Sequence, residues 1–197
     1  ESFARSDGNT VPAFAVDDGS VYFSPSTSVY NAAEPSSAIA TLTDTVAAFG
    51  IVKEDSQTGA SYKIYYSSTS SDGFFLWNGS EKSEIKEHGQ EGSSVRGIKS
   101  IKPYGGDFYL VTATAVKRYA PADNAFNGYE IGKRALTDLS AYGSRIVVTD
   151  RTDGSALVYE NGAGRRVLLR NGDASLSPDF VCAGEGAFLV ASGNAFY

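Results

Sequence analysis

Three aspartates stand in comparable sequence contexts and could carry acid–base chemistry. Asp44 and Asp138 each follow a Leu-Thr pair, and Asp179 follows Leu-Ser-Pro. Carboxyl groups that converge on one site raise one another's pKa and can divide into an acid and a base, as glycoside hydrolysis requires. The sequence therefore allows a carbohydrate-active hydrolase with these three catalytic residues. A structural role is the alternative, because Asp at the start of a strand accepts hydrogen bonds from backbone N–H groups of a turn.

Adjacent aromatic residues indicate a candidate binding surface. Tyr65 and Tyr66 are neighbours, as are Phe74 and Phe75. Neighbouring residues of a strand face opposite sides of the sheet, so one member of each pair is expected to point away from the core. An exposed aromatic side chain can stack on a sugar ring or anchor a protein partner. We expect a binding surface made by Tyr65, Tyr66 and Phe75.

The remaining polar motifs predict neither a metal site nor a cofactor. The acidic turns at Asp17-Asp18-Gly19 and Asp150 to Gly154 lack the alternating acidic spacing of a calcium loop. His88 is the only histidine, lies in a polar connector, and has no Gly-x-Ser-x-Gly motif to serve. Cys182 is the only cysteine, which excludes an internal disulfide, and we expect it to be a small buried apolar residue. Most of these residues are interpreted as turns or surface.

Composition indicates one globular domain of 197 residues, of which 42% are hydrophobic and 12% aromatic. The net charge of −6 argues against a nucleic-acid partner, which would require a clustered basic face. No apolar run is long enough for a transmembrane segment. The abundance of Ser, Thr, Gly, Asn and Tyr resembles exported bacterial proteins and favours a secreted, periplasmic or cell-surface location.

The elements that must position these residues form a repeat. Five aromatic residues recur at intervals of 38 to 47 residues: Tyr30, Trp77, Tyr119, Tyr159 and Tyr197. The clearest unit contains strand-like stretches at 144–150, 156–160 and 165–170, separated by Asp153-Gly154 and Asn161-Gly162. Such dipeptides accept the positive φ angles of tight hairpins. A period near 40 residues made of short strands is typical of a radial β repeat.

The pattern resembles β-propeller repeats in general over nearly the whole chain. It lacks the Gly-His and Trp-Asp pairs of WD40 repeats. Residues 70–77 are similar to the sialidase Asp box but have the glycine one place early, so that family's chemistry is not expected. The resemblance implies an all-β fold with five four-stranded blades, at about 11–42, 44–88, 97–131, 136–170 and 177–197.

The last unit shows only three strands, and residues 2–5 precede the first, so we expect residues 2–5 to complete the last blade and close the ring. A fragment of a larger propeller and a β sandwich or barrel are the alternatives. In a propeller the first strand of each blade lines the central channel, where Asp44, Asp138 and Asp179 would converge. We expect a binding module that presents blade loops or a channel end to a protein or glycan, with the hydrolase as the alternative.

Overall fold

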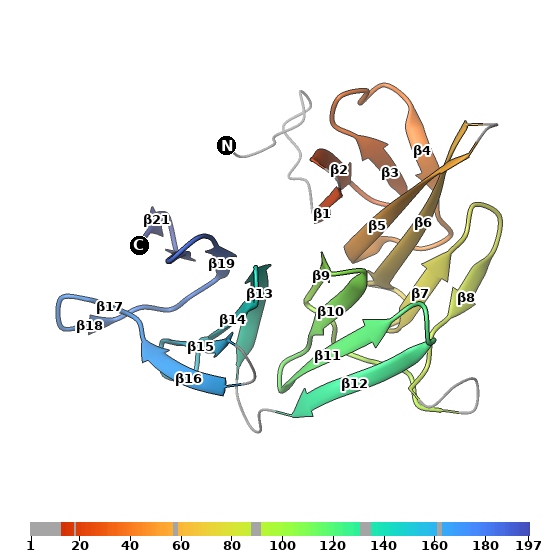
Figure 1. Ribbon diagram of the computed structural model, residues 1–197. Coiled ribbons are helices and arrows are strands. Elements are labelled where there is room, and N and C mark those ends of the chain that lie inside the picture. Colours follow the sequence, from red (N-terminus) through yellow and green to blue (C-terminus); the bar gives the residue numbers. More distant parts are fainter. Residues whose placement is uncertain (1–12, 18, 57–58, 88–91, 131–134, 161–162) are drawn as a thin grey trace.

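The computed structural model describes residues 13–17, 19–56, 59–87, 92–130, 135–160 and 163–197. Every regular element among them is a strand, and the main sheets are successive antiparallel strands joined in chain order. Figure 1 shows these sheets following one another around a common centre as five blades. The predicted all-β, five-bladed propeller is confirmed.

The first strand of each blade lies innermost and the others follow outward in chain order. Blade 1 contains β1 (Ala13–Asp17), β2 (Ser20–Ser24), β3 (Ser28–Asn31) and β4 (Ala38–Thr41); blade 2 contains β5 (Val46–Ser56), β6 (Gly59–Ser68), β7 (Phe74–Trp77) and β8 (Lys82–Glu84). Blade 3 contains β9 (Ser100–Tyr104), β10 (Asp107–Val111), β11 (Ala115–Ala120) and β12 (Ala125–Glu130); blade 4 contains β13 (Leu136–Tyr142), β14 (Arg145–Asp150), β15 (Ser155–Glu160) and β16 (Ala163–Leu168).

Blade 5 shows three strands among the described residues: β19 (Phe180–Ala183), β20 (Phe188–Ser192) and β21 (Ala195–Phe196). A small hairpin of β17 (Arg170–Asn171) and β18 (Ala174–Ser175) connects blade 4 to blade 5. Residues 2–5 lie outside the described part of the chain, so the closing strand expected from them remains a prediction.

The turn between β14 and β15 shows how the sequence fixes a hairpin. Asp150 accepts a hydrogen bond on Oδ1 from the backbone N–H of Thr152, at 2.8 Å. Gly154 has φ +62°, and a Cβ there would lie 2.3 Å from the carbonyl oxygen of Leu176. Glycine is required both for the left-handed backbone and for the close approach. The expected structural role of this acidic turn is thus observed.

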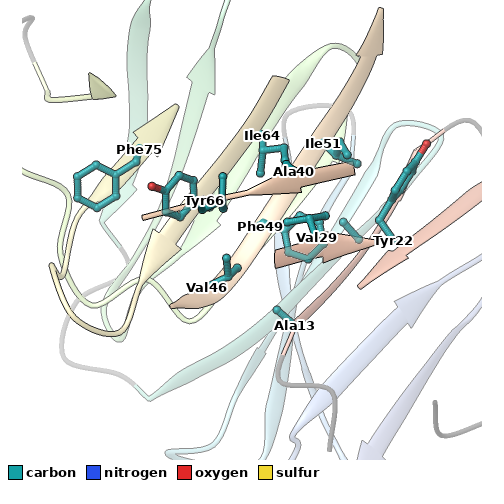
Figure 2. Packing of buried hydrophobic residues seen from close by; sticks show 12 residues of the cluster. Ala13, Tyr22, Val29, Ala40, Val46, Phe49, Ile51, Ile64, Tyr66 and Phe75 are labelled. Carbon is teal, nitrogen blue, oxygen red and sulfur yellow. The ribbon is translucent and has the colours of Figure 1, made fainter. Parts of the chain in front are cut away.

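Hydrophobic clusters join each blade to the next one along the chain. In Figure 2, Tyr22 and Val29 of blade 1 meet Phe49, Ile51 and Tyr66 of blade 2. Corresponding clusters lie between blades 2 and 3, blades 3 and 4, and blades 4 and 5. Each of blades 2, 3 and 4 is therefore buried on both of its faces, as stacked repeats require.

Candidate functional site

A small pocket lies where the inner strands of all five blades meet. Its volume is about 100 Å³, and β1, β5, β9, β13 and β19 all contribute to its wall. Since every blade supplies its first strand, this pocket belongs to the central channel. Its lining consists of Ala13, Phe14, Ala47, Ala48, Phe49, Lys99, Ser100, Ile101, Lys102, Thr137, Asp138 and Phe180.

A local irregularity in β13 positions Asp138 in this pocket. The pairing of β13 with β14 shifts register between Leu136 and Leu139, which is the signature of a β-bulge. The Thr149 side chain replaces the missing ladder bonds: its Oγ1 accepts from the Asp138 N–H and donates to the Asp138 carbonyl oxygen, each at 3.2 Å. A bulge can re-aim a side chain, and here it lies at the residue that reaches the channel.

Asp138 connects three blades through its carboxylate. Oδ1 accepts a hydrogen bond from Ser100 Oγ of blade 3 at 2.8 Å, and Oδ2 accepts one from the Val181 N–H of blade 5 at 3.2 Å. Lys102 Nζ lies 3.6 Å from Oδ1. The residue is 4% exposed. A buried carboxylate needs such donors and a positive charge, so its first role is to tie adjacent inner strands together.

Asp44 lies outside the pocket lining and anchors loops of blade 2. Its Oδ2 accepts from Lys82 Nζ at 2.5 Å and from Thr43 Oγ1 at 3.0 Å, and its Oδ1 accepts from Ser71 Oγ at 2.9 Å. Burial by itself would raise the pKa of this carboxyl group. The hydrogen bonds from Lys82, Ser71 and Thr43 and the charge of Lys82 outweigh burial, and together they lower the pKa to about 2.

Asp179 also lies outside the pocket lining. It forms an ion pair with Arg151, and its Oδ2 accepts a hydrogen bond from the Gly193 N–H at 2.9 Å, within the turn between β20 and β21. Of the three aspartates, the structure therefore places only Asp138 in the pocket. Asp44 binds groups of blade 2, and Asp179 binds Arg151 of blade 4 and a turn of blade 5. Both therefore have the structural role that the sequence left open.

The expected binding surface of Tyr65, Tyr66 and Phe75 is buried. These side chains are 5%, 0% and 5% exposed. Tyr65 packs against Phe108 of blade 3, with ring centroids 4.2 Å apart, whereas Tyr66 and Phe75 belong to the cluster shared with blade 1. The neighbours do face opposite sides of the sheet, but both sides are interfaces between blades. Burial between the blades also raises the pKa of Tyr65 and of Tyr66.

Two aromatic residues of the pocket wall were not predicted from the sequence. Phe14 and Phe180 line the pocket, and each residue as a whole is well exposed, at 56% and 62%. Lys102 Nζ lies 5.5 Å from the centroid of the Phe14 ring, and Lys99 Nζ donates to the Leu136 carbonyl oxygen at 2.9 Å. Alternation within β1 and β19 was the available signal, since both phenylalanines are flanked by residues of the opposite face.

Two smaller expectations have outcomes as well. Cys182 is exposed, not buried as predicted, because it lies on the face of β19 opposite to Val181, which packs against blade 4. His88 lies outside the described residues.

Within the described ranges no group of three or more His, Cys, Asp or Glu is arranged to hold a metal ion. In the same part of the chain, no helix has the length and hydropathy to cross a membrane.

Comparison with known proteins adds structural matches only. No protein-family model matches the sequence, and no curated protein matches it. Two structures of the extracellular domain of BT4673 from B. thetaiotaomicron match with TM-scores of 0.61 and 0.65 at 12% identity. The alignments cover 94% and 98% of this chain, which spans only 26% and 27% of those chains.

Two further structures are similar over most of this chain. A structure of a nidogen/laminin complex matches with a TM-score of 0.64 at 13% identity, covering 93% of this chain and 72% of the other. Hydrazine synthase of Kuenenia stuttgartiensis matches with a TM-score of 0.64 at 17% identity, covering 93% and 62%. At sequence identities this low, structural similarity shows a shared fold but not a shared function. The chain has the β-propeller fold.

Proposed function

We propose that this chain is an extracytoplasmic binding module that presents the end of its channel to a protein partner. The observation that carries the proposal is the pocket on the axis, where Phe14 and Phe180 line the wall beside Lys102 and the buried Asp138. Apolar rings next to a few fixed polar groups are typical of recognition sites.

The size of the pocket favours one inserted side chain over a small-molecule substrate. Its volume is about 100 Å³. Pockets that enclose a drug-sized ligand usually measure about 300–1,000 Å³. A sugar ring or a cofactor would therefore remain mostly outside, whereas the end of one side chain from a partner's surface would fit. We accordingly favour a protein over a glycan as the ligand.

The charge of the pocket favours an acidic side chain. Its lining contains two lysines and one aspartate, Lys99, Lys102 and Asp138. Each ammonium group carries three donors. The contacts described above use one donor of Lys99 and place Lys102 near Asp138 at 3.6 Å, so donor capacity remains for a second carboxylate. A Glu or Asp of the partner would restore charge balance.

The comparisons support an interaction role at a coarse level. Among the similar structures are an extracellular domain and a propeller crystallised in a nidogen/laminin complex. The extracytoplasmic location proposed from composition agrees with the first of these.

The hydrolase alternative has less support. Glycoside hydrolysis usually needs a second carboxyl group within about 10 Å of the first. The pocket lining contains one acidic residue, Asp138, and both of its oxygens already accept hydrogen bonds. Hydrolysis of a glycan panel that is lost in Asp138→Asn would revive the hydrolase hypothesis.

A peptide-display selection tests the binding proposal directly. We expect the immobilised chain to enrich peptides that contain Glu or Asp beside an aliphatic residue. Their binding should weaken about tenfold or more in Lys102→Ala, because an ion-paired contact is lost. Lys63→Ala is the matched control, since Lys63 is a surface lysine paired with Glu54 away from the pocket lining. Selection of peptides without acidic residues, or equal loss in both variants, would refute the proposal.

A further inference from the structure

The two ends of the blade array differ from the junctions within it. Within the described residues, hydrophobic clusters join blades 1 and 2, 2 and 3, 3 and 4, and 4 and 5. In Figure 1, blade 1 and blade 5 lie at the two ends of the series. Each of them has one face in a cluster, and the other face of each carries exposed apolar side chains.

The outer face of blade 5 is an apolar sheet surface. The register pairs Phe180 with Ala191, Ala191 with Phe196, and Cys182 with Leu189, so these residues share one face. Phe180, Leu189 and Phe196 are 62%, 58% and 79% exposed. The intervening Val181 and Val190 on the opposite face are 7% and 2% exposed and pack against blade 4.

The outer face of blade 1 has the same character. Phe14 and Val16 are 56% and 49% exposed, while Ala13 and Ala15, which alternate with them along β1, are 6% and 5% exposed and pack toward blade 2. Phe14 lies opposite Phe23 in the sheet, and the Phe23 ring stacks on Tyr30 with centroids 5.3 Å apart. None of the residues that make this face or the blade 5 face is charged, unlike the surface strands that usually face water.

We propose that these two faces, which we call the seam faces, receive a further antiparallel sheet of the same polypeptide. Each of the four observed junctions buries apolar faces of two sheets that are consecutive in the chain. Along the strands of the seam faces, apolar residues that pack within the array alternate with apolar residues that are exposed. A sheet that continues the series would bury these exposed residues in the same way as the four observed junctions do.

The lengths of similar propellers agree with this assignment. The alignments cover 93% of this chain but only 72% of the chain in the nidogen/laminin structure and 62% of the hydrazine synthase chain. Polypeptides that contain a comparable array therefore extend beyond it. The seam faces indicate that this array, too, is completed by more sheet.

Thiol labelling tests the proposal because Cys182 lies on a seam face and is exposed. A maleimide should modify Cys182 readily in the 197-residue chain. In the natural polypeptide that contains this chain, modification should be slowed about tenfold or more, because a covered thiol reacts only when the sheet opens. Both proteins unfolded in guanidinium should react equally. Equal rates in the folded proteins, or a natural polypeptide that ends with this chain, would overturn the proposal.

A disulfide experiment on the 197-residue chain distinguishes the other occupants. Val16→Cys places a second thiol on the blade 1 seam face, opposite Val21 in β2. A disulfide needs Cα atoms within about 7 Å of each other. We expect no intramolecular bond between positions 16 and 182 under mild oxidation. Rapid formation of that bond, absent when Cys182→Ser is added, would show that the seam faces close on each other.

A second copy of the chain is the last competing occupant. If it covered the seam faces, the apparent mass in solution would rise to that of a dimer and would fall back in Leu189→Glu. We expect the unmodified chain and Leu189→Glu both to have the mass of a monomer in solution at every protein concentration measured. A dimer that depends on Leu189 would overturn the proposal in favour of self-association.

Discussion

At the scale of single residues, the carboxylates of this chain act mainly as organisers of the ring. Asp138 joins inner strands of blades 3, 4 and 5, and Asp44 gathers a lysine and several hydroxyl groups around one loop of blade 2. Both groups accept several hydrogen bonds, so each carboxylate connects segments that are far apart in the chain. Sequence context alone showed that these residues recur, whereas the identity of their donors depends on the fold.

The lowered pKa of Asp44 predicts a specific dependence of stability on pH. Its pKa in the folded protein is about 2, below the ordinary value of 3.8 for an aspartate. Ionised Asp44 therefore stabilises the fold above about pH 4, and this contribution disappears as the pH falls through 2. Asp44→Asn should therefore lower the free energy of unfolding by about 1–2 kcal/mol at pH 7. The difference from wild type should shrink toward pH 2.

Chemical denaturation between pH 7 and pH 2 measures this effect. Glu34→Gln is the control, since Glu34 is exposed, and it should change the free energy of unfolding by less than about 0.5 kcal/mol at every pH. A constant difference between wild type and Asp44→Asn across the whole range would show that Asp44 contributes through its shape and not its charge.

At the scale of elements, the connections are set by glycines whose requirements differ. Gly154 and Gly172 have nearly the same backbone, with φ +62° and +60°. A Cβ at position 154 would meet the Leu176 carbonyl oxygen at 2.3 Å, whereas at position 172 nothing lies within 4 Å. Gly172→Ala should cost about 1–2 kcal/mol for the left-handed backbone alone. Gly154→Ala should lower the free energy of unfolding by more than Gly172→Ala does. The difference between the two variants in thermal or denaturant unfolding measures the clash with the Leu176 carbonyl oxygen. Equal costs would contradict the packing of blade 4 against the 169–176 connection.

The strand β20 offers a matched pair of neighbouring positions. Val190 is 2% exposed in the cluster with blade 4, and Leu189 beside it is 58% exposed on the seam face. In the 197-residue chain, Val190→Ser should lower the free energy of unfolding by about 2 kcal/mol or more. Leu189→Ser should change it by less than about 0.5 kcal/mol. A large loss for Leu189→Ser would mean that the seam face is buried in solution.

The sequence predicted the elements better than it predicted the site. Hairpin dipeptides such as Asp153-Gly154 and the spacing of aromatics were sufficient for the blade order, because both are local signals of turn and strand. The prediction for Tyr65 and Tyr66 failed because it assumed a sheet with one solvent face, and an internal blade has none. Phe14 and Phe180 were missed because alternation within a strand shows which residues leave the core of their blade, but not which of them reach the channel pocket.

At the scale of the whole molecule, the stacking of blades predicts a gradient of local stability. Blades 2, 3 and 4 contact a hydrophobic cluster on each face, whereas blades 1 and 5 have one cluster each within the described residues. In a stacked array, a terminal unit lacks one neighbour interaction and opens at lower free energy. Backbone amides of β20 should therefore exchange with solvent faster than those of β10, although both are middle strands of their blades.

Hydrogen exchange measured by NMR or mass spectrometry under native conditions checks this gradient. Protection in β10 should approach the global free energy of unfolding, and protection in β20 should correspond to a smaller opening free energy. In the natural polypeptide, the additional sheet proposed above would raise protection in β20 and leave β10 unchanged. If β20 is already as protected as β10 in the 197-residue chain, its blade has a neighbour on both faces and the ring closes upon itself.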